Sequence, residues 1–193
     1  MNAENVLIAL RSLGERVAFE WQAERGRRAP DRSIRVVIAG GAAGLLAGMF
    51  RASCATVDCD VPSRIEDERT QQLLERAAAA VAERLELSDE WLSFRCRVFV
   101  SEWLLGWEGR CERVAGDFGP LEVARLSRID LIVSKVMAAS RRPQDREDLR
   151  DLSPTDAEWS TVLLHLDRVE AEHLDRKEFD TERALVSALR SRR

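Results

Sequence analysis

The chain has 193 residues, 45% of them hydrophobic, which is enough for one domain with a buried core, with or without a helical appendage. Its formal net charge of -4 argues against broad non-specific binding of nucleic acid through charge alone, although a local basic groove stays compatible with it. No apolar run has membrane-spanning length, the N-terminus carries no secretion signal, and the four cysteines have no C-x-x-C spacing, so we expect a cytoplasmic protein with no membrane partner, zinc site or disulfide framework.

The first half of the chain predicts two long helices around a strand, helix and strand. Apolar residues spaced by threes and fours predict an opening helix over residues 6–21. A strand is then expected over 34–39, a helix over 41–50, and a second strand over 56–61. Repeated alanines favour a helix over 66–85.

The second half predicts a strand pair followed by helices. Residues 110–114 and 120–126, separated by a turn rich in glycine, indicate an antiparallel pair. Residues 95–100 alternate briefly between polar and apolar, and 103–107 fit either a buried turn or a loop over a site. Three tryptophans in this region are expected to pack in the core or in a lid rather than to stack on bases, namely Trp91, Trp103 and Trp107.

Two serines indicate where helices of the second half begin. Ser127 fits the N-cap of a helix that contains Lys135, because its hydroxyl can accept from a free amide of the first turn. Ser153, followed by Pro154 in the first helical position, predicts the start of another helix. Two charged amphipathic helices are expected to finish the chain.

Two aspartates share one face of the strand predicted over 56–61. Asp58 and Asp60 are two residues apart, and alternate side chains of a strand project together. Adjacent carboxylates repel each other, a divalent cation offsets that cost, and hard oxygen ligands suit Mg²⁺. The alternative is that the two acids only turn the chain toward Pro62. Thr56 lies on the same face, where it could bond a phosphate or a water, although strand propensity alone also accounts for it.

A pair of glycines follows the first predicted strand. Gly40 and Gly41 have no side chains, so their backbone can approach a phosphate, and the start of the next helix favours negative charge. Glycines also recur every fourth residue, at Gly40, Gly44 and Gly48, which would let a neighbouring backbone come close. The two roles can coexist. Metal and phosphate together indicate a nucleotide.

The order of strand, Gly-Gly, short helix and Asp-x-Asp strand resembles the entry to the nucleotidyltransferase fold of the polymerase-beta type. Further along, Lys135 followed by Asp145 and Asp148-Leu149 is similar to the lysine and Asp-x-x-Asp-Leu pattern of small bacterial nucleotidyltransferases related to the AbiEii-type toxins. Residues 78–92 resemble a helix and tryptophan segment that some members carry between the two motifs. Together these matches cover roughly residues 33–152.

The resemblance implies an α+β fold in which helices flank a mixed sheet. It implies a nucleotidyltransferase-like domain over residues 1–152 and a helical C-terminal extension over 153–193 that packs on it. Asp58 and Asp60 would bind Mg²⁺, and Glu122, on the strand predicted over 120–126, is the candidate third carboxylate. The candidates for binding an NTP and its phosphates are Gly40, Gly41, Thr56, Lys135, Arg142, Asp145 and Asp148.

Lys135 stands out because the basic residues are otherwise arginines, apart from Lys177. A compact ammonium could follow a phosphate as it leaves, whereas an ordinary helix lysine would only be solvated. Asp145 and Asp148 are surrounded by arginines, so surface ion pairs explain them about as well as a functional role does.

The chain also departs from the family pattern. More residues than usual separate Gly41 from Asp58, Cys54 stands where an arginine often precedes the threonine, and Arg51 is displaced upstream. Gln144 stands where a basic residue is more common. These differences leave the register of the Asp-x-Asp strand open.

Two functions are compatible with these residues. The first is a Mg²⁺-dependent nucleotidyltransferase that moves a nucleotide from an NTP to a hydroxyl of an RNA such as a tRNA 3′ end, of a protein or of a small molecule. The resemblance extends this to a toxin with an antitoxin or other partner protein. The second is a scaffold that has lost activity and serves as a binding or regulatory module, which the displaced Arg51 would favour.

Overall fold

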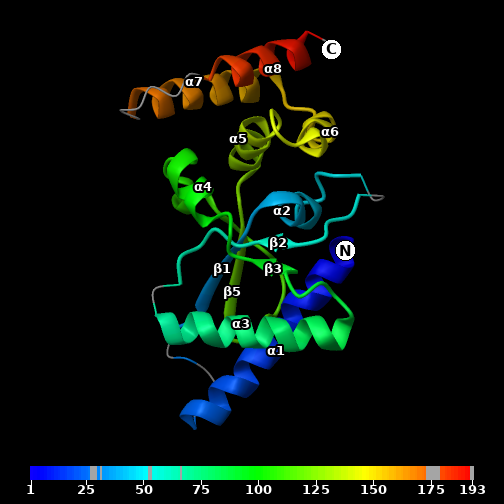
Figure 1. The fold of residues 1–193 in the computed structure, drawn as a ribbon, viewed down its shortest axis with the longest axis vertical. Helices are drawn as coiled ribbons and strands as arrows, with labels where there is room; N and C mark the ends of the chain where they lie inside the picture. Colours follow the sequence, from blue (N-terminus) through cyan, green and yellow to red (C-terminus); the bar gives the residue numbers. More distant parts are fainter. Residues whose placement is uncertain (27–29, 31, 52–53, 66, 173–178, 192–193) are drawn as a thin grey trace.

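The structure is a computed structural model that describes residues 1–26, 30, 32–51, 54–65, 67–172 and 179–191. Helices flank a small mixed sheet, so the expected α+β class is confirmed (Figure 1). Figure 1 shows α1 and α3 at one end of the molecule, the strands in the middle and the helices from α5 to α8 at the other end. Among the described residues, no helix combines the length and apolar character that a membrane span requires.

The central sheet has three strands in the order β1-β5-β4. β1 (Ile34–Ile38) pairs in parallel with β5 (Leu121–Arg125), and β4 (Glu112–Arg113) pairs with β5 in the antiparallel sense. The antiparallel pair expected between 110 and 126 is therefore confirmed. A second sheet joins β2 (Cys59–Asp60) in parallel to β3 (Leu92–Ser93).

The strand predicted over 56–61 is shorter than expected. β2 begins at Cys59, so Asp58 lies in the segment before the strand rather than within it. One reason is that the Thr56 amide donates to the Met1 carbonyl (2.9 Å) instead of to a neighbouring strand. A single bridge between Ala39 and Asp60 then connects β2 to the end of β1.

Two long helices pack against each other at one end of the molecule. α1 (Ala3–Arg25) begins at Asn2, whose side chain accepts from the Asn5 amide, and it ends at Gly26 with a φ of 65°. Its predicted apolar stripe is buried in the core and contacts α3 (Glu68–Leu85), which Asp67 caps through the Thr70 amide. Both helices were predicted from the sequence, with the first residue of the second prediction, 66, outside the described residues.

The structure defines two segments that the sequence left open and shortens one predicted helix. The alternating residues 95–100 begin helix α4 (Arg97–Trp103), in which Val100 and Trp103 are buried one turn apart. The segment 103–107 is a buried turn before the short 3₁₀ helix η1 (Trp107–Arg110), and the three tryptophans of this region lie in the core. Helix α2 (Gly40–Leu46) ends earlier than predicted, before Gly48 with a φ of 63°.

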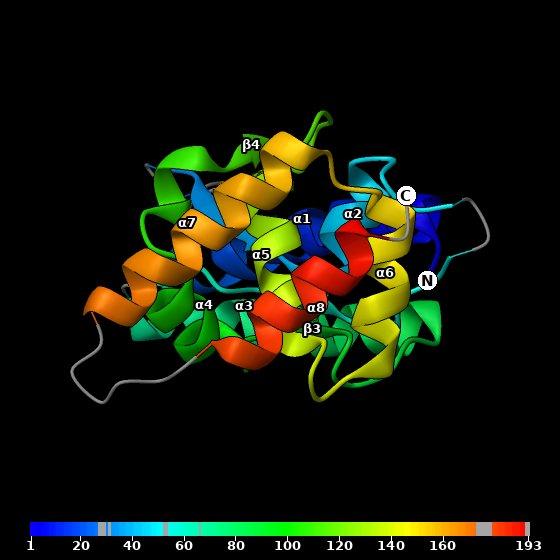
Figure 2. The same ribbon diagram turned by 90° about the horizontal axis from the view of Figure 1, so that it is seen from above.

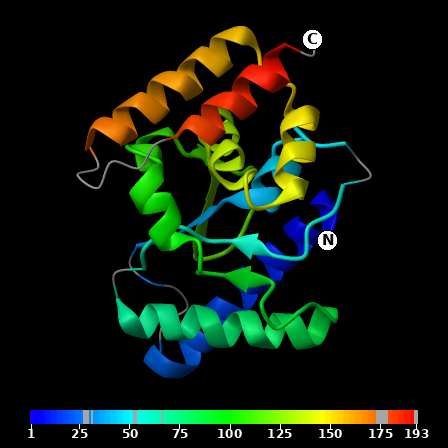
Figure 3. The ribbon, with the colours of Figure 1, turned by 45° about the horizontal axis from the view of Figure 1, so that its top comes forward.

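The last four helices form a layer at the other end of the molecule. α5 (Arg128–Ala138) begins at Ser127, whose hydroxyl accepts from the Asp130 amide as predicted. α6 (Pro143–Leu152) packs on α5, and α7 (Asp156–Glu172) and α8 (Asp180–Arg190) lie side by side across it (Figures 2 and 3). The division of the chain at residues 152 and 153 stays a prediction.

The predicted N-cap at Ser153 is wrong. Ser153 ends α6 in the left-handed conformation, with a φ of 46°. The hydroxyl of Thr155 accepts from the Glu158 amide (3.2 Å), and the Glu158 carboxylate accepts from the Thr155 amide (2.7 Å). This reciprocal arrangement is a capping box, so α7 is capped by Thr155.

Candidate functional site

Asp60 lies where the two sheets meet. The Ala39 amide donates to the Asp60 carbonyl (2.8 Å), which fixes β2 at the end of β1 and beside the first turn of α2. Gly40, in the left-handed conformation with a φ of 61°, packs directly on the Asp60 side chain, because a Cβ there would lie 2.6 Å from Asp60 Oδ2. A Cβ at Gly41 would lie 3.1 Å from Thr56 Oγ1. The glycine pair is therefore the surface against which these two polar side chains pack.

Asp58 and Thr56 stand beside Asp60. The Thr56 hydroxyl donates to the Asp58 carbonyl (3.0 Å) and lies 3.4 Å from Asp58 Oδ1. The pKa of Asp60 is raised above its usual value, first by burial and then by the negative charge of Asp58. The two carboxylates are thus close enough to repel each other, as expected if they share a site.

A small pocket of about 120 Å³ contains most of the residues predicted from the sequence. Both glycines, Thr56 and the two aspartates line it, together with side chains from the loop before β2 and from α5 and α6. The residues that line the pocket are Gly40, Gly41, Leu45, Phe50, Cys54, Ala55, Thr56, Asp58, Asp60, Lys135, Arg142, Gln144 and Asp148.

Lys135 is buried between two aspartates of α6. Its Nζ lies 2.6 Å from Asp145 Oδ1 and 2.5 Å from Asp148 Oδ2. Arg142 adds a longer contact, from its Nε to Asp145 Oδ2 (3.3 Å), while most of its side chain is exposed. Asp145 is only 1% exposed and Asp148 7%, so the alternative of surface ion pairs is wrong for these two residues.

The turn between α5 and α6 explains this arrangement. Pro143 starts α6 shortly after the end of α5, so the two helices pack against each other. Asp145 and Asp148 are three residues apart, which places both on the face of α6 that meets Lys135. The sequence pattern identified these residues, and the packing of the two helices explains why they meet.

Glu122 is not brought to this cluster. Glu122 pairs with Arg35 of β1. Arg35 is three residues before Ile38, so Glu122 lies away from the end of β1 that meets Asp60. Its carboxylate is 3.8 Å from Arg35 Nε, and it lines none of the pockets described here. Glu122 therefore does not supply the expected third carboxylate in this structure.

A larger pocket of about 360 Å³ adjoins the small one. Both pockets are lined by Gly40, Asp60, Lys135 and Arg142, which form their common wall. The other residues of the larger pocket come from the end of β1, from the segment 95–100, from α5 and the turn after it, and from α6. They are Ala39, Arg95, Cys96, Phe99, Val100, Ser134, Met137, Ala138, Arg141 and Asp145.

Sequence reasoning did not assign most of this second group to a site. The segment 95–100 was interpreted only as a weak alternation, although its helical register places Cys96, Phe99 and Val100 on the pocket side. The pKa of the Cys96 thiol is raised to about 12, first by burial and then by the charge of Asp60, so it stays a neutral thiol. Predicting a helix for this segment would have placed these three residues on one face and indicated the pocket.

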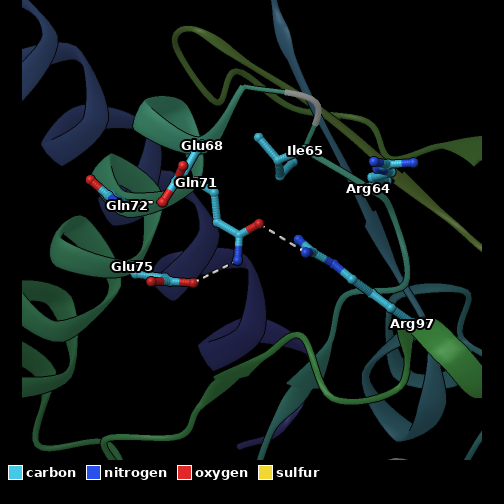
Figure 4. A pocket seen from close by; sticks show the side chains of 7 residues that line it. All are labelled: Arg64, Ile65, Glu68, Gln71, Gln72, Glu75 and Arg97. Carbon is cyan, nitrogen blue, oxygen red and sulfur yellow. Dashed lines mark hydrogen bonds between the residues drawn. The ribbon is translucent and has the colours of Figure 1, made fainter.

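A separate pocket of about 380 Å³ lies between α3 and the start of α4 (Figure 4). In it, Arg97 Nη1 donates to Gln71 Oε1 (2.9 Å), and Gln71 Nε2 donates to Glu75 Oε1 (2.8 Å). Figure 4 shows this chain of side chains spanning the pocket from α4 to α3. Nε and Nη2 of Arg97 have no hydrogen-bond partner among the described residues, and none of the predicted site residues lines this pocket.

Asp58 and Asp60 fit a divalent cation better than a closed metal centre. The described residues contain no group of three or more histidine, cysteine, aspartate or glutamate side chains arranged to hold a metal. Mg²⁺ is usually bound by one or two carboxylates, with water and substrate phosphates completing its octahedron. Burial and then the charge of Asp58 raise the pKa of Asp60, and a cation bound by the two carboxylates would offset both effects, so the pair suits such an open site.

A mixed sheet flanked by helices, with a glycine pair at one strand end packed on an Asp-x-Asp segment, fits the nucleotidyltransferase-like fold. Residues 22–193 match the model of the family described as "Nucleotidyltransferase of unknown function (DUF6036)", and the chain belongs to this family. No curated protein and no solved structure matches the chain. The expected nucleotidyltransferase family is confirmed, while the relation to AbiEii-type toxins stays a prediction.

Proposed function

We propose that the protein is a Mg²⁺-dependent nucleotidyltransferase that transfers a nucleotide from an NTP to an acceptor hydroxyl. The observation that supports this proposal most is the small pocket, in which Asp58 and Asp60 lie against Gly40 and Gly41. Its carboxylates outnumber its cationic side chains, since Asp145 and Asp148 already neutralise Lys135. A divalent cation with its nucleotide would balance this charge.

In the proposed reaction, the acceptor oxygen attacks the α-phosphorus in line, the bond from that phosphorus to the pyrophosphate breaks, and the hydroxyl proton passes to water. Bound Mg²⁺ would supply charge neutralisation at the phosphates. Asp58 and Asp60 hold the cation, and the Thr56 hydroxyl, which lies beside both the glycine pair and Asp58, bonds a phosphate oxygen or a bound water. The backbone of the glycine pair keeps the phosphates close, because no side chain intervenes.

The structure changes the role that we propose for Lys135. Its ammonium has two carboxylate partners at hydrogen-bond distance, so it does not offer an unpaired charge to a triphosphate. Arg142, whose side chain is 66% exposed and lines both pockets, is better placed to neutralise the phosphates. Lys135, Asp145 and Asp148 would then be positioning residues that hold α5 and α6 together behind the site.

The acceptor and the biological role extend this proposal. An RNA end such as the 3′ end of a tRNA, a protein hydroxyl and a small molecule are all compatible acceptors. The resemblance of the lysine and Asp-x-x-Asp-Leu segment to AbiEii-type toxins supports a toxin role with an antitoxin or another partner protein. An acceptor screen with radiolabelled NTPs against bulk RNA, protein and small molecules tests these alternatives directly.

A second candidate function is an inactive scaffold that binds a nucleotide or a partner without transferring anything. Two observations favour it, namely that Lys135 is already neutralised and that Glu122 lies away from the site. Both candidates share the same fold, so they differ only in metal dependence and turnover.

Calorimetry with Mg²⁺ and each NTP, followed by pyrophosphate release with bulk RNA, separates the two. For the enzyme, nucleotide binding requires Mg²⁺ and is abolished by Asp58→Ala and by Asp60→Ala. Asp167→Ala, at a largely exposed aspartate of α7, is the matched control and should bind like the wild type. Nucleotide binding that ignores both the metal and the two site substitutions would support the scaffold instead.

A further inference from the structure

We propose that the larger pocket receives the nucleoside of the donor nucleotide and that it favours guanine over adenine. This inference rests on the proposed function and adds the nucleotide that the enzyme uses. Its basis is the size of the two adjoining pockets, the apolar lining of the larger one, and the kind of hydrogen-bonding groups that remain unpaired there.

The two pockets would bind different parts of the nucleotide. Pockets that enclose a small ligand usually measure about 300–1,000 Å³. The small pocket, at about 120 Å³, is below this range, and its carboxylates and glycine backbone suit a cation and the phosphates next to it. The larger pocket, at about 360 Å³, is within the range and begins at the same wall. An α-phosphate held at Asp60 would therefore have its nucleoside in the larger pocket.

The lining of the larger pocket suits a planar heterocycle. Phe99 and Val100 of α4 and Met137 and Ala138 of α5 provide apolar surface in it. An aromatic ring stacks on nucleic acid bases of any kind, and a methionine thioether makes favourable contacts with ring edges. This part of the pocket would bind a base without selecting among bases.

Selection requires hydrogen-bonding groups that are not already paired. Arg95 is bound by both carboxylate oxygens of Glu90, and Lys135 lies between its two aspartates. The Ser134 hydroxyl donates to the Leu131 carbonyl (2.8 Å). Arg141, in contrast, has no side-chain hydrogen bond or ion pair with the part of the chain that the structure describes. Arg142 and Asp60, which also line this pocket, are assigned to the phosphates and the cation, so the Arg141 guanidinium is the group left for a base.

A guanidinium can only donate, which decides between the bases. Guanine presents two adjacent acceptors, O6 and N7, that match the arginine fork. Adenine places its amino group, which is a donor, beside N7 at the same edge, so an arginine fork meets a donor there. Uracil presents one carbonyl, O4, at that edge with no ring acceptor beside it, and should be intermediate. Cys96, as a neutral thiol, adds no charged acceptor that would reverse this preference.

The test is competitive binding of non-hydrolysable α,β-methylene analogues of the four NTPs, in Mg²⁺, to the full chain. The guanine analogue should bind about tenfold more tightly than the adenine analogue, the size expected for one bidentate contact. Arg141→Met should bring this ratio close to one and leave adenine affinity nearly unchanged. Arg69→Met, at an exposed arginine of α3 outside the pockets, is the matched control and should keep the wild-type ratio.

A second pair of variants tests the apolar lining. Phe99→Ala should weaken all four analogues alike without changing the binding of Mg²⁺-tripolyphosphate, which has no base. The adjacent Val98→Ala, at a residue 75% exposed, should change neither. Thermal unfolding of each variant shows that it is folded.

Three outcomes would overturn the inference. The first is equal affinity of the wild type for all four analogues. The second is an equal loss of affinity for every nucleotide in Arg141→Met, which would mean that this arginine contacts phosphate. The third is unchanged nucleotide affinity in Phe99→Ala. In each of them, metal-dependent binding that Asp60→Ala abolishes would still support the proposed function. If no nucleotide binds the wild type at all, the proposed function fails, and this inference fails with it.

Discussion

The side chain of Asp60 occupies the space that a side chain at Gly40 would need. A Cβ on Gly40 would lie 2.6 Å from Asp60 Oδ2, and Gly40 has a φ of 61°. Two separate requirements for glycine therefore coincide, one from the backbone and one from the carboxylate. The second requirement connects the glycine pair with the proposed metal site.

Gly40→Ala should abolish Mg²⁺-dependent nucleotide binding. The left-handed backbone costs an alanine about 1–2 kcal/mol, and the carboxylate of Asp60 must also rotate away from the new methyl group. Because a side chain can move more easily than backbone, the larger effect should fall on binding rather than on folding. Calorimetry and urea unfolding measure the two effects.

Gly48→Ala is the matched control for this substitution. Gly48 has nearly the same backbone conformation, with a φ of 63°, but a Cβ there would meet nothing within 4 Å. The Gly48→Ala variant should also lose about 1–2 kcal/mol of stability but should keep nucleotide binding. Equal binding by the two variants would contradict the contact between Gly40 and Asp60 as a requirement of the site.

The pKa of Asp60 predicts how stability depends on pH. Burial and the charge of Asp58 raise this pKa above the usual 3.8 of an aspartate. Below 3.8 the carboxyl is protonated in both the folded and the unfolded state and costs nothing. As pH rises from 3.8 through the raised folded pKa, the unfolded chain loses this proton before the folded protein does, so the protein loses stability. The loss is complete above the folded pKa.

Asp60→Asn should therefore stabilise the metal-free protein at pH 7, with a gain that shrinks to nothing in acid. Urea unfolding in EDTA at a series of pH values measures this. Mg²⁺ should raise the stability of the wild type but not that of the variant. Asp89→Asn, at an exposed residue, is the control and should change stability by less than about 0.5 kcal/mol at any pH. A variant less stable than the wild type at pH 7 in EDTA would contradict the prediction.

Local patterns predicted the elements that carry the site. The apolar run before Gly40, the glycine pair and the Asp-x-Asp spacing are all short-range signals, and the structure brings them together. The extent of β2 was not predictable in this way, because the Thr56 amide donates to the carbonyl of Met1, which is 55 residues away in the sequence. Such a contact leaves no signal in the local sequence.

Glu122 and the helix α4 show the same limit in another form. The sequence predicted the strand that carries Glu122, but its distance from Asp60 depends on the parallel register, which pairs it with Arg35. A few residues of alternation, such as 95–100, do not distinguish a strand from the first turns of a helix. Tertiary packing of Val100 and Trp103 decided that segment.

Lys135→Met should be the most destabilising of the site substitutions. It leaves Asp145 and Asp148 buried without their cation, and breaking a buried ion pair costs about 3–5 kcal/mol. Urea unfolding of the metal-free protein measures this loss. The further substitution of both aspartates by asparagine should recover most of it, since no uncompensated charge then remains.

The control for Lys135 is an ion pair at the surface. Arg51, whose side chain is 72% exposed, contacts Asp151 at 2.9 Å, and Arg51→Met should lower the free energy of unfolding far less than Lys135→Met does. The triple variant combines Lys135→Met with Asp145→Asn and Asp148→Asn. If this folded variant still binds nucleotide with Mg²⁺, Lys135 is a positioning residue as proposed. Loss of binding by this stable triple variant would instead support a direct contact between Lys135 and the phosphates.

Thr155→Ala should lower the free energy of unfolding by about 1 kcal/mol, the usual cost of removing an N-cap. The Thr155 hydroxyl accepts from the Glu158 amide, and that amide would lose its partner at the start of α7. Ser160→Ala, within the same helix, is the matched control. Its exposed hydroxyl only donates back to the Asp156 carbonyl (2.9 Å), so alanine should be neutral or slightly stabilising there. Similar losses in the two variants would show that the capping box contributes nothing beyond an ordinary helical hydroxyl.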